Sequence, residues 1–200
     1  SGDRCFAAGG DLRELEAVRS EADTLAMSRR ARAALEQIRQ FPVPVIAALN
    51  GHALGGGAEL AMACDMRIAT THTELGFLQA QLNVTTAGGG GIDLLAALGS
   101  ARGLQILLEA RRIPAVEALQ LGLLQRVCAA DETLADCSAA FIAPFVERPA
   151  QVLRAFKALA LGNRRALHER LASQEERGFT TTWIHADHWT AAARALAPRP

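Results

Sequence analysis

Three consecutive glycines at residues 55–57 restrict the fold of this chain more than any other feature of its sequence. They follow an apolar run at 43–49, rich in β-branched residues, that is typical of a strand covered on both faces. They precede a run of small and apolar residues at 58–64 that indicates a buried helix. Glycines at such a junction let the backbone approach a neighbour closely, and the first amides of the helix can bind an oxyanion. The sequence therefore predicts an α/β fold with a strand–turn–helix unit here.

The first part of the chain alternates short apolar strands with helices, which is the α/β pattern. We expect strands at 4–8, 43–49 and 66–70, a turn of small residues at 50–57, and helices at 21–39, 58–64, 88–98 and 101–110. From residue 132 onward the pattern predicts helices only, at 132–146, 149–161, 164–176 and 186–196. The chain is thus expected to consist of a sheet-bearing core, 1–130, and a helical C-terminal region, 131–200.

Composition excludes several classes of protein. The 200 residues are 50% apolar, and 21 basic residues balance 21 acidic ones, with the arginines spread along the chain. Intrinsic disorder is excluded, and neither nucleic acid nor an anionic membrane is expected as a partner. The longest apolar runs are much shorter than the roughly 20 residues that span a bilayer.

The four cysteines form no CxxC motif and no secretory signal is seen before them, so we expect reduced thiols, no metal site and a cytoplasmic protein.

Glu59 lies one turn into the helix that follows the three glycines. It is interpreted either as a favourable partner of the helix dipole or as a buried acid–base group. A second corner of small residues at 6–12 ends the first predicted strand. Two such corners could aim two backbone amides at one oxygen, and each donor of that kind contributes on the order of 10²- to 10³-fold in rate.

Two segments carry a resemblance to a known family. FAAGGDL at 6–12 and NGHALGGGAELAMACDMRIA at 50–69 are similar to the two signatures of the enoyl-CoA hydratase/isomerase (crotonase) family, and the glycines at 88–91 and the stretch 115–127 fit the same pattern. The resemblance covers essentially the whole chain and implies that an N-terminal part of the family fold is missing. It implies a spiral of ββα units whose helical C-terminal region packs a homotrimer or a hexamer. It also implies an acyl-CoA thioester substrate, with coenzyme A as part of that substrate and no separate cofactor.

The resemblance also assigns roles to individual residues. The amides of Ala8 and Gly56 match the two oxyanion-hole donors, and Glu59 matches the first catalytic glutamate. The segment that contacts coenzyme A is matched by Ala7, Asp11, Leu12 and Arg13.

Gln79 stands where hydratases of this family have their second catalytic glutamate. An amide has no proton to exchange near neutral pH, so efficient hydration is in doubt. Three chemistries stay open: isomerisation with Glu59 alone, decarboxylation of a malonyl-type thioester such as methylmalonyl- or ethylmalonyl-CoA, and residual hydration with Glu74 or Asp93 as second carboxylate. A non-catalytic acyl-CoA binder is a further alternative, because a fold does not establish activity.

Other conspicuous side chains are expected to be structural. We expect His52, in the glycine loop, to have a structural role rather than to contact substrate, and His185 and His188 to be surface or interface residues rather than metal ligands. Trp183 and Trp189 are expected to anchor a C-terminal helix. The glycines at 88–91 lack the lysine of a phosphate-binding loop, so they predict no nucleotide site.

Overall fold

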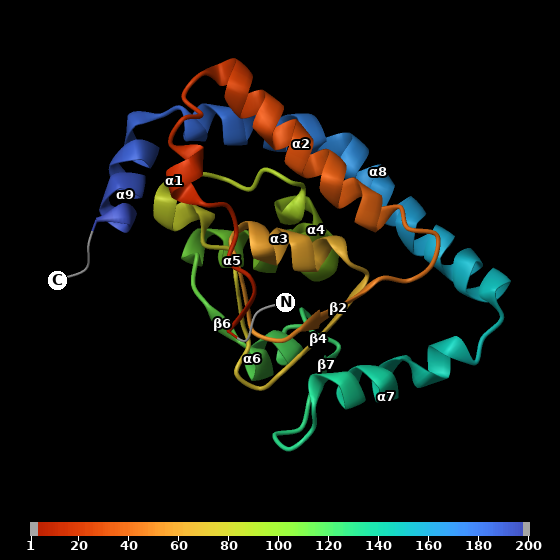
Figure 1. Cartoon of the computed structure of the whole chain (residues 1–200). Helices are drawn as coiled ribbons and strands as arrows, with labels where there is room; N and C mark the ends of the chain where they lie inside the picture. The colour runs from red at the N-terminus through yellow and green to blue at the C-terminus, as the bar shows by residue number, and fades with distance from the viewer. Residues whose placement is uncertain (1–3, 198–200) are drawn as a thin grey trace.

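The computed structural model describes residues 4–197, and Figure 1 shows how its strands form two small sheets beneath a layer of helices. The first sheet has the order β1 (Cys5–Ala7), β3 (His52–Leu54), β5 (Glu74–Gly76) and β6 (Ile113–Pro114). The second has the order β2 (Ile46–Leu49), β4 (Met66–Ala69) and β7 (Arg126–Val127). Only the β5–β6 pair is antiparallel among these described strands.

The helices are α1 (Leu12–Leu15), α2 (Glu21–Arg39), α3 (Gly56–Ala63), the 3₁₀ helix η1 (Gln79–Leu82), α4 (Gly90–Leu98), α5 (Ser100–Glu109), α6 (Ala115–Gln120), α7 (Leu134–Val146), α8 (Ala150–Trp183) and α9 (Ala186–Leu196). Within residues 4–197, none of them has the length and apolar character that a membrane span requires.

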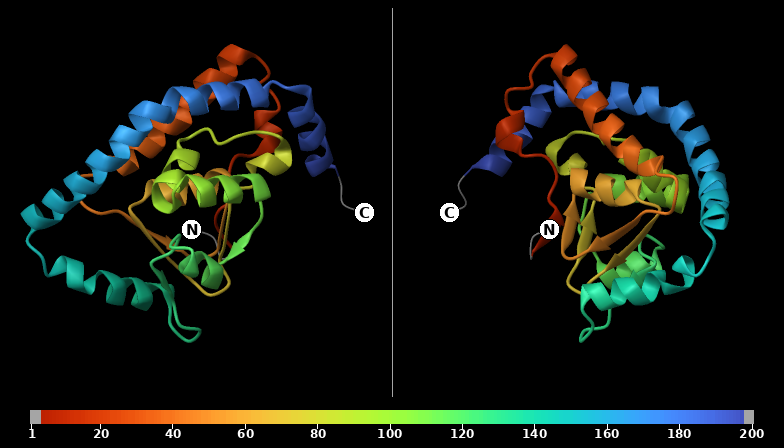
Figure 2. Two further views of the ribbon diagram at one scale, coloured as in Figure 1. Left: turned by 180° about the vertical axis from the view of Figure 1, so that it is seen from behind. Right: turned by 45° about the vertical axis from the view of Figure 1, so that its right-hand side comes forward.

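The main core lies between the strands and the pair α3 and α4, which pack on each other. Its largest members are almost fully buried: Leu49, Met62, Phe77, Leu94 and Leu123. Helices α2 and α8 lie side by side across α3 and α4 (Figure 1), and α7 and α9 lie at the two ends of α8 (Figure 2). The α/β fold class and the helical C-terminal region expected from the sequence are therefore confirmed.

Local signals account for most helix bounds. Helix α2 begins after Ser20, whose hydroxyl accepts a hydrogen bond from the amide of Asp23, and it ends at Arg39, two residues before Phe41. The turn expected at 50–57 was partly wrong, because residues 52–54 form β3, which pairs with β1 and β5. Three residues are too few to show an alternating pattern, so the strand could not be recognised among the glycines that follow it.

The prediction of two helices at 149–161 and 164–176 was also wrong, since α8 continues without a break through Gly162. Tertiary contacts hold the helix on both sides of that glycine. Lys157 forms an ion pair with Asp65 over 2.6 Å, and Arg164 forms one with Asp93 over 2.7 Å. Two anchors of this kind outweigh the roughly 1 kcal/mol that a helical glycine costs.

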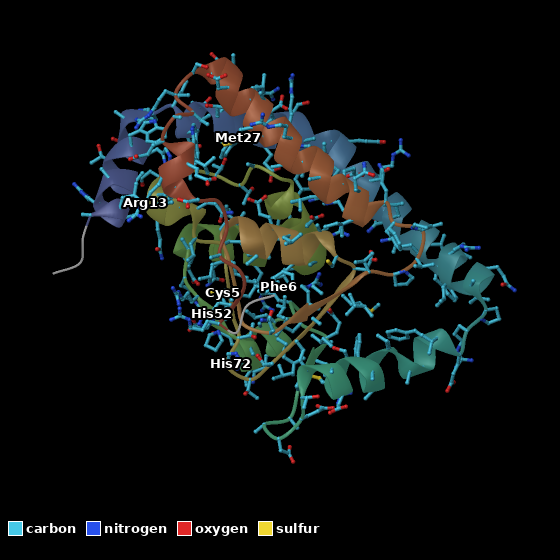
Figure 3. The ribbon with its side chains drawn as sticks, in the orientation of Figure 1. Cys5, Phe6, Arg13, Met27, His52 and His72 are labelled. Atoms are coloured by element: carbon cyan, nitrogen blue, oxygen red, sulfur yellow. A yellow bond between two sulfur atoms is a disulfide. The ribbon has the colours of Figure 1, made fainter. Side chains whose placement is uncertain are left out.

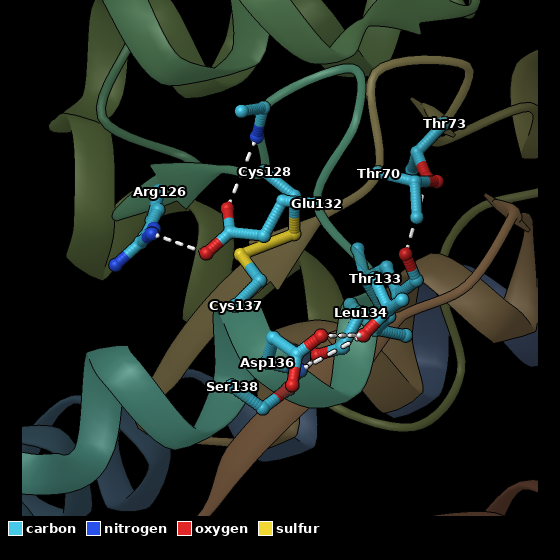
Figure 4. Close-up of a disulfide and its surroundings, with 12 residues drawn as sticks. Thr70, Thr73, Arg126, Cys128, Glu132, Thr133, Leu134, Asp136, Cys137 and Ser138 are labelled. Atoms are coloured by element: carbon cyan, nitrogen blue, oxygen red, sulfur yellow. Dashed lines mark hydrogen bonds and ion pairs between the residues drawn. A yellow bond between two sulfur atoms is a disulfide. The ribbon is translucent and has the colours of Figure 1, made fainter.

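The expectation of reduced thiols is contradicted at one pair of cysteines. Cys128, just after β7, and Cys137, on α7, form a disulfide with a Cα–Cα distance of 5.6 Å (Figure 4). The loop between them turns back at Glu132, which accepts hydrogen bonds from Arg126 and from the amide of Ala129. Disulfides persist mainly in oxidising compartments, so the cysteines no longer support a cytoplasmic location.

An aromatic cluster fixes α9 against the rest of the chain, as expected for the two tryptophans. Trp183 and Trp189 meet edge to face with ring centroids 5.5 Å apart, and the indole of Trp183 donates to the carbonyl of Val18. The expectation for His188 was wrong: it is fully buried, with its ring against both tryptophans and Nδ1 2.7 Å from the carbonyl of Leu82. The contacts of the His188 ring with both indoles account for its burial.

Candidate active site

The two glycine corners predicted from the sequence lie in contact. Residues 7–9 lie at the end of β1, residues 55–57 lie at the start of α3, and β1 pairs with β3 directly before the second corner. A methyl group on Gly57 would lie 2.0 Å from the carbonyl oxygen of Ala7, so only glycine permits this approach. A methyl group on Gly56 would lie 3.5 Å from Gly9 Cα. Ala8, Gly9 and Gly56 are exposed, so this corner is open to a ligand from outside.

Glu59 is buried one turn further along α3, with 5% of its surface exposed. The amides of Gly88 and Gly90 donate hydrogen bonds to Oε2 over 2.8 and 3.0 Å. The amide of Ala87 and the side-chain amide of Gln79 donate to Oε1 over 3.3 and 3.0 Å. The carboxylate therefore lies at the N-terminus of α4, where the unpaired amides and the helix dipole favour negative charge.

Gly90 makes this position of Glu59 possible. A methyl group at residue 90 would lie 2.3 Å from Glu59 Cγ, closer than real side chains pack. The sequence predicted that the glycines at 88–91 open a helix, and α4 begins at Gly90. Their close packing against Glu59 adds a second reason for glycine at this point.

The environment raises the pKa of Glu59 above its ordinary value. Burial is the largest cause, because it disfavours the charged form, and the negative charge of Glu175 on α8 acts in the same direction. The amides of Gly90, Gly88 and Ala87 oppose both effects without overcoming them. Glu59 consequently keeps its proton to a higher pH than an exposed glutamate does. A raised pKa of this kind suits a general acid–base group.

Gln79, on η1, faces Glu59 and donates the hydrogen bond to its Oε1. Its side-chain carbonyl Oε1 is buried and has no hydrogen-bond partner in the described part of the chain. Turning the amide over would bring Oε1 towards Glu59, where it could accept a hydrogen bond from the protonated carboxyl group. Gln79 can thus form a hydrogen bond with Glu59 in either protonation state, but it cannot itself act as an acid or a base.

The two carboxylates considered as substitutes for a second glutamate are placed elsewhere. Glu74 is on β5, where its side chain pairs with Arg112 over 3.1 Å and lies near His52. Asp93 is completely buried in ion pairs with Arg39 and Arg164 and is 2.7 Å from His168 Nε2. Both carboxylates form ion pairs with arginines, which disfavours the hypothesis that Glu74 or Asp93 shares the chemistry with Glu59.

Glu175 is the acidic residue near the site that sequence reasoning missed. It comes from α8, far along the chain, and it resembles the many other acidic residues of an exposed helix face. Only the packing of α8 against α2 and α4 brings it close to Glu59. A regular helix pattern carries no signal for such a contact.

The segment expected to contact coenzyme A continues from the first corner. Asp11 caps α1 by accepting a hydrogen bond from the amide of Arg13, and Leu12 begins that helix. The Arg13 side chain is exposed on α1, well away from Cys5, Phe6 and His52 on the adjacent strands β1 and β3 (Figure 3). Arg13 is therefore accessible to an anion. His52 accepts a hydrogen bond from the amide of Glu74 and so has the expected structural role.

Other features of the described surface lie apart from this site. Depressions of about 510 Å³ beside Ser100 and about 340 Å³ beside Phe41 include neither Glu59 nor Gln79 in their walls. A group of potential metal ligands in residues 4–197 is Cys128, Glu132 and Cys137. Its two sulfur atoms are joined in the disulfide.

Comparison with known proteins identifies the family. The family model described as enoyl-CoA hydratase/isomerase matches residues 1–193. The chain belongs to the enoyl-CoA hydratase/isomerase family. The resemblance inferred from the two glycine corners is thereby confirmed.

Curated members of the enoyl-CoA hydratase/isomerase family show the same similarity. The chain is 34% identical over 161 residues to a probable enoyl-CoA hydratase of Bacillus subtilis (strain 168), covering 80% of this chain and 62% of that protein. It is 31% identical over 179 residues to an ethylmalonyl-CoA decarboxylase of Xenopus laevis, covering 89% of this chain and 60% of that protein. The chain thus spans about 60% of the length of these relatives.

Solved structures of the family share the fold. A crystal structure of an enoyl-CoA hydratase from Mycobacterium avium subsp. paratuberculosis K-10 superimposes with a TM-score of 0.83 at 25% identity, covering 95% of this chain and 75% of that one. An enoyl-CoA hydratase from Bacillus anthracis gives a TM-score of 0.75 at 29% identity, covering 100% of this chain and 78% of that one. The crotonase-like fold expected from the resemblance is confirmed.

Proposed function

We propose that the protein processes an acyl-CoA thioester by stabilising its enolate, with the amides of Ala8 and Gly56 as oxyanion donors and Glu59 as the acid–base group. The observation that carries this proposal is the contact between the corner at 7–9 and the corner at 55–57, with buried Glu59 one helical turn away. Gly56 is the first residue of α3, so its N–H has no acceptor within that helix. A thioester oxygen that gains negative charge would accept from both amides.

In this proposal, Glu59 removes a proton from the carbon next to the thioester and returns it at another carbon, which isomerises a double bond. The enolate charge forms beside the two amides, and the proton stays on Glu59 between the two transfers. The raised pKa of Glu59 supports such a carrier, because burial and the charge of Glu175 favour the protonated form more than in an exposed glutamate. Coenzyme A is proposed to contact the segment Ala7, Asp11, Leu12 and Arg13.

Decarboxylation of a malonyl-type thioester is a second candidate, and Gln79 favours it. Loss of CO₂ breaks the bond to the carboxylate carbon and leaves its electron pair in the enolate, so no base is needed to form that enolate. A single proton donor, Glu59, then completes the reaction. The glutamine beside Glu59 and the similarity to an ethylmalonyl-CoA decarboxylase support this candidate.

The experiment that tests both candidates presents crotonyl-CoA, a 3-enoyl-CoA, methylmalonyl-CoA and ethylmalonyl-CoA to the chain and follows product mass. Isomerisation leaves the mass unchanged and moves the double bond, whereas decarboxylation removes CO₂ and hydration adds water. Replacing Glu59 with Gln is expected to lower turnover by about 10²- to 10⁴-fold. Binding of all four thioesters without turnover of any would reject the enzymatic proposal and favour the acyl-CoA binder.

The assembly is proposed from the family resemblance: the helical region at 131–200 packs homotrimers, which can pair into hexamers. Large apolar side chains of α7 and α8 are exposed in the single chain, namely Val146, Phe156 and Leu159. Their exposure supports an interface, because burying large apolar side chains against a neighbouring subunit is favourable. Sedimentation equilibrium of the purified chain tests this proposal, and a monomer across the micromolar range would contradict it.

A further inference from the structure

Two carboxylates lie against the first turn of α4. Glu59 reaches it from α3 and accepts hydrogen bonds from Gly88 and Gly90. Glu175 reaches it from α8, and a methyl group on Gly91 would lie 3.1 Å from its Oε1. Adjacent glycines at the start of one helix therefore accommodate both acids.

Glu175 is held in one place by two donors. The hydroxyl of Thr86 donates a hydrogen bond to Oε1 over 2.6 Å, and the guanidinium of Arg32 on α2 forms an ion pair with Oε2 over 2.7 Å. The side chain of Glu175 is 9% exposed, and Thr86 is buried. A charge with so little contact with water acts on its neighbours with weak screening.

Other charged groups surround the same glycines, but most of them neutralise one another. Arg39 of α2 and His168 of α8 both contact Asp93 of α4. The groups on the strands packed against α3 lie at other places: Arg67 of β4 binds carbonyls at the end of α3, and His52 of β3 faces Glu74. From η1, Gln79 brings no charge.

We propose that Glu175 is a positioning residue of the site, whose carboxylate, fixed by Arg32 and Thr86, governs the exchange of a proton at Glu59. This inference rests on the proposed function, in which Glu59 carries the proton. Like charges at one helix N-terminus disfavour simultaneous ionisation, so Glu175 keeps Glu59 ready to be protonated. The charge of Glu175 is accordingly one of the causes that raise the pKa of Glu59. Helix α8 would then contribute to the chemistry without contacting substrate.

The experiment is an NMR titration of the chain labelled with ¹³C at glutamate Cδ, with the Glu59 resonance assigned from the variant Glu59→Gln. In Glu175→Gln, the amide oxygen still accepts from Thr86 but the charge is gone, so the Glu59 midpoint is expected to move to lower pH. The matched control is Glu176→Gln. Glu176 is the next residue on α8 and also pairs with an arginine of α2, Arg29, so its removal is expected to leave the midpoint unchanged.

A second variant moves the midpoint in the opposite direction and does not depend on the folding of the first. Arg32→Gln removes the cation that compensates Glu175, so the Glu59 midpoint is expected to move to higher pH. An unchanged midpoint in both Glu175→Gln and Arg32→Gln would overturn the proposal, as would an equal shift in Glu176→Gln.

Turnover of the four thioesters by the same samples separates this proposal from the proposed function. A shifted midpoint without turnover in the unsubstituted chain supports the electrostatic link and rejects the proposed function. Turnover with an unshifted midpoint supports the proposed function and rejects the role of Glu175.

Discussion

The side-chain amide of Gln79 donates a hydrogen bond to Glu59 over 3.0 Å, while its own carbonyl oxygen is buried and without a partner among the described residues. Gln79 takes the position at which hydratases of the family have a second glutamate, and its amide cannot carry a proton as that glutamate could. The arrangement favours reactions that need a single carrier, namely isomerisation and decarboxylation, over the addition of water.

Replacing Gln79 with Glu should restore the second carboxylate and introduce hydration. We expect the rate of water addition to crotonyl-CoA to rise by about 10²-fold or more, because a second acid–base group becomes available. Product mass and the loss of enoyl absorbance measure the change. Gln81→Glu, on the same 3₁₀ helix but bonded to the carbonyl of Ala110, is the matched control. Equal hydration by both variants would contradict the assignment of Gln79.

The pH dependence of isomerisation should follow the ionisation of Glu59. A base must be ionised, and the pKa of Glu59 is raised by burial and by Glu175, so kcat/KM is expected to fall as pH decreases, with a midpoint above that of an ordinary glutamate. Glu59→Gln should abolish this limb together with most of the activity. Glu74→Gln, which removes a partly exposed carboxylate of β5, should leave the profile unchanged. A profile that is flat through the acidic range would exclude Glu59 as the base.

Gly90→Ala should displace Glu59 and destabilise the chain. The added methyl group would lie 2.3 Å from Glu59 Cγ, and overpacking of this kind costs roughly 1–3 kcal/mol. Urea unfolding measures the loss of stability, and turnover should fall in parallel. Gly162→Ala is the control, because it lies within α8 with no atom within 4 Å of the added methyl group and should stabilise by about 0.5–1 kcal/mol. Equal stability of Gly90→Ala and the unsubstituted chain would show that Glu59 is not packed as described.

Asp93→Asn should be strongly destabilising, because it leaves Arg39 and Arg164 without their shared anion in a buried place. Removing one partner of such a cluster costs about 3–5 kcal/mol. The pKa of Asp93 is lowered, despite opposing desolvation, by the hydrogen bond from His168 and by both arginines. Its stabilisation is therefore complete above the ordinary aspartate pKa and is lost as pH falls through the lower folded value. The difference in unfolding free energy between the two proteins should shrink in acid, and a constant difference would contradict this role.

The disulfide should be detectable as a deficit of free thiols. In denaturant without reductant, we expect Cys5 and Cys64 to react with a thiol reagent while Cys128 and Cys137 do not. Its loop is short, so the double variant Cys128→Ser, Cys137→Ser should lose roughly 2–3 kcal/mol of unfolding free energy. Four reactive thiols in protein purified without reductant would mean that the bond does not form.

Elements with strong local signals could be predicted from the sequence, and those set by distant contacts could not. Helix α2, with its Ser20 cap, and the glycine turn before Glu59 were found because their patterns are complete within a few residues. Strand β3 was missed because three residues are too few to show a periodicity. The continuity of α8 depends on the ion pairs of Lys157 and Arg164 with carboxylates far away in the sequence, and a window of local sequence holds no information about such partners.

The same limit applies to the site. The alignment with known signatures located Glu59 and Gln79, and the structure brings them into contact. The alignment could not show that Asp93 forms ion pairs with two arginines. It also could not show that Glu175, more than 100 residues later in the sequence, acts on Glu59. Both facts arise from the packing of α8 on α2 and α4.

The shared position of Glu59 and Glu175 at the start of α4 has a thermodynamic consequence. If the anion on α8 makes Glu59 bind its proton more tightly, then each ionisation of Glu59 must weaken the attachment of α8 by the same free energy, because the coupling is reciprocal. Helix α8 would therefore be attached less tightly to the rest of the chain when Glu59 is ionised and more tightly when it is protonated.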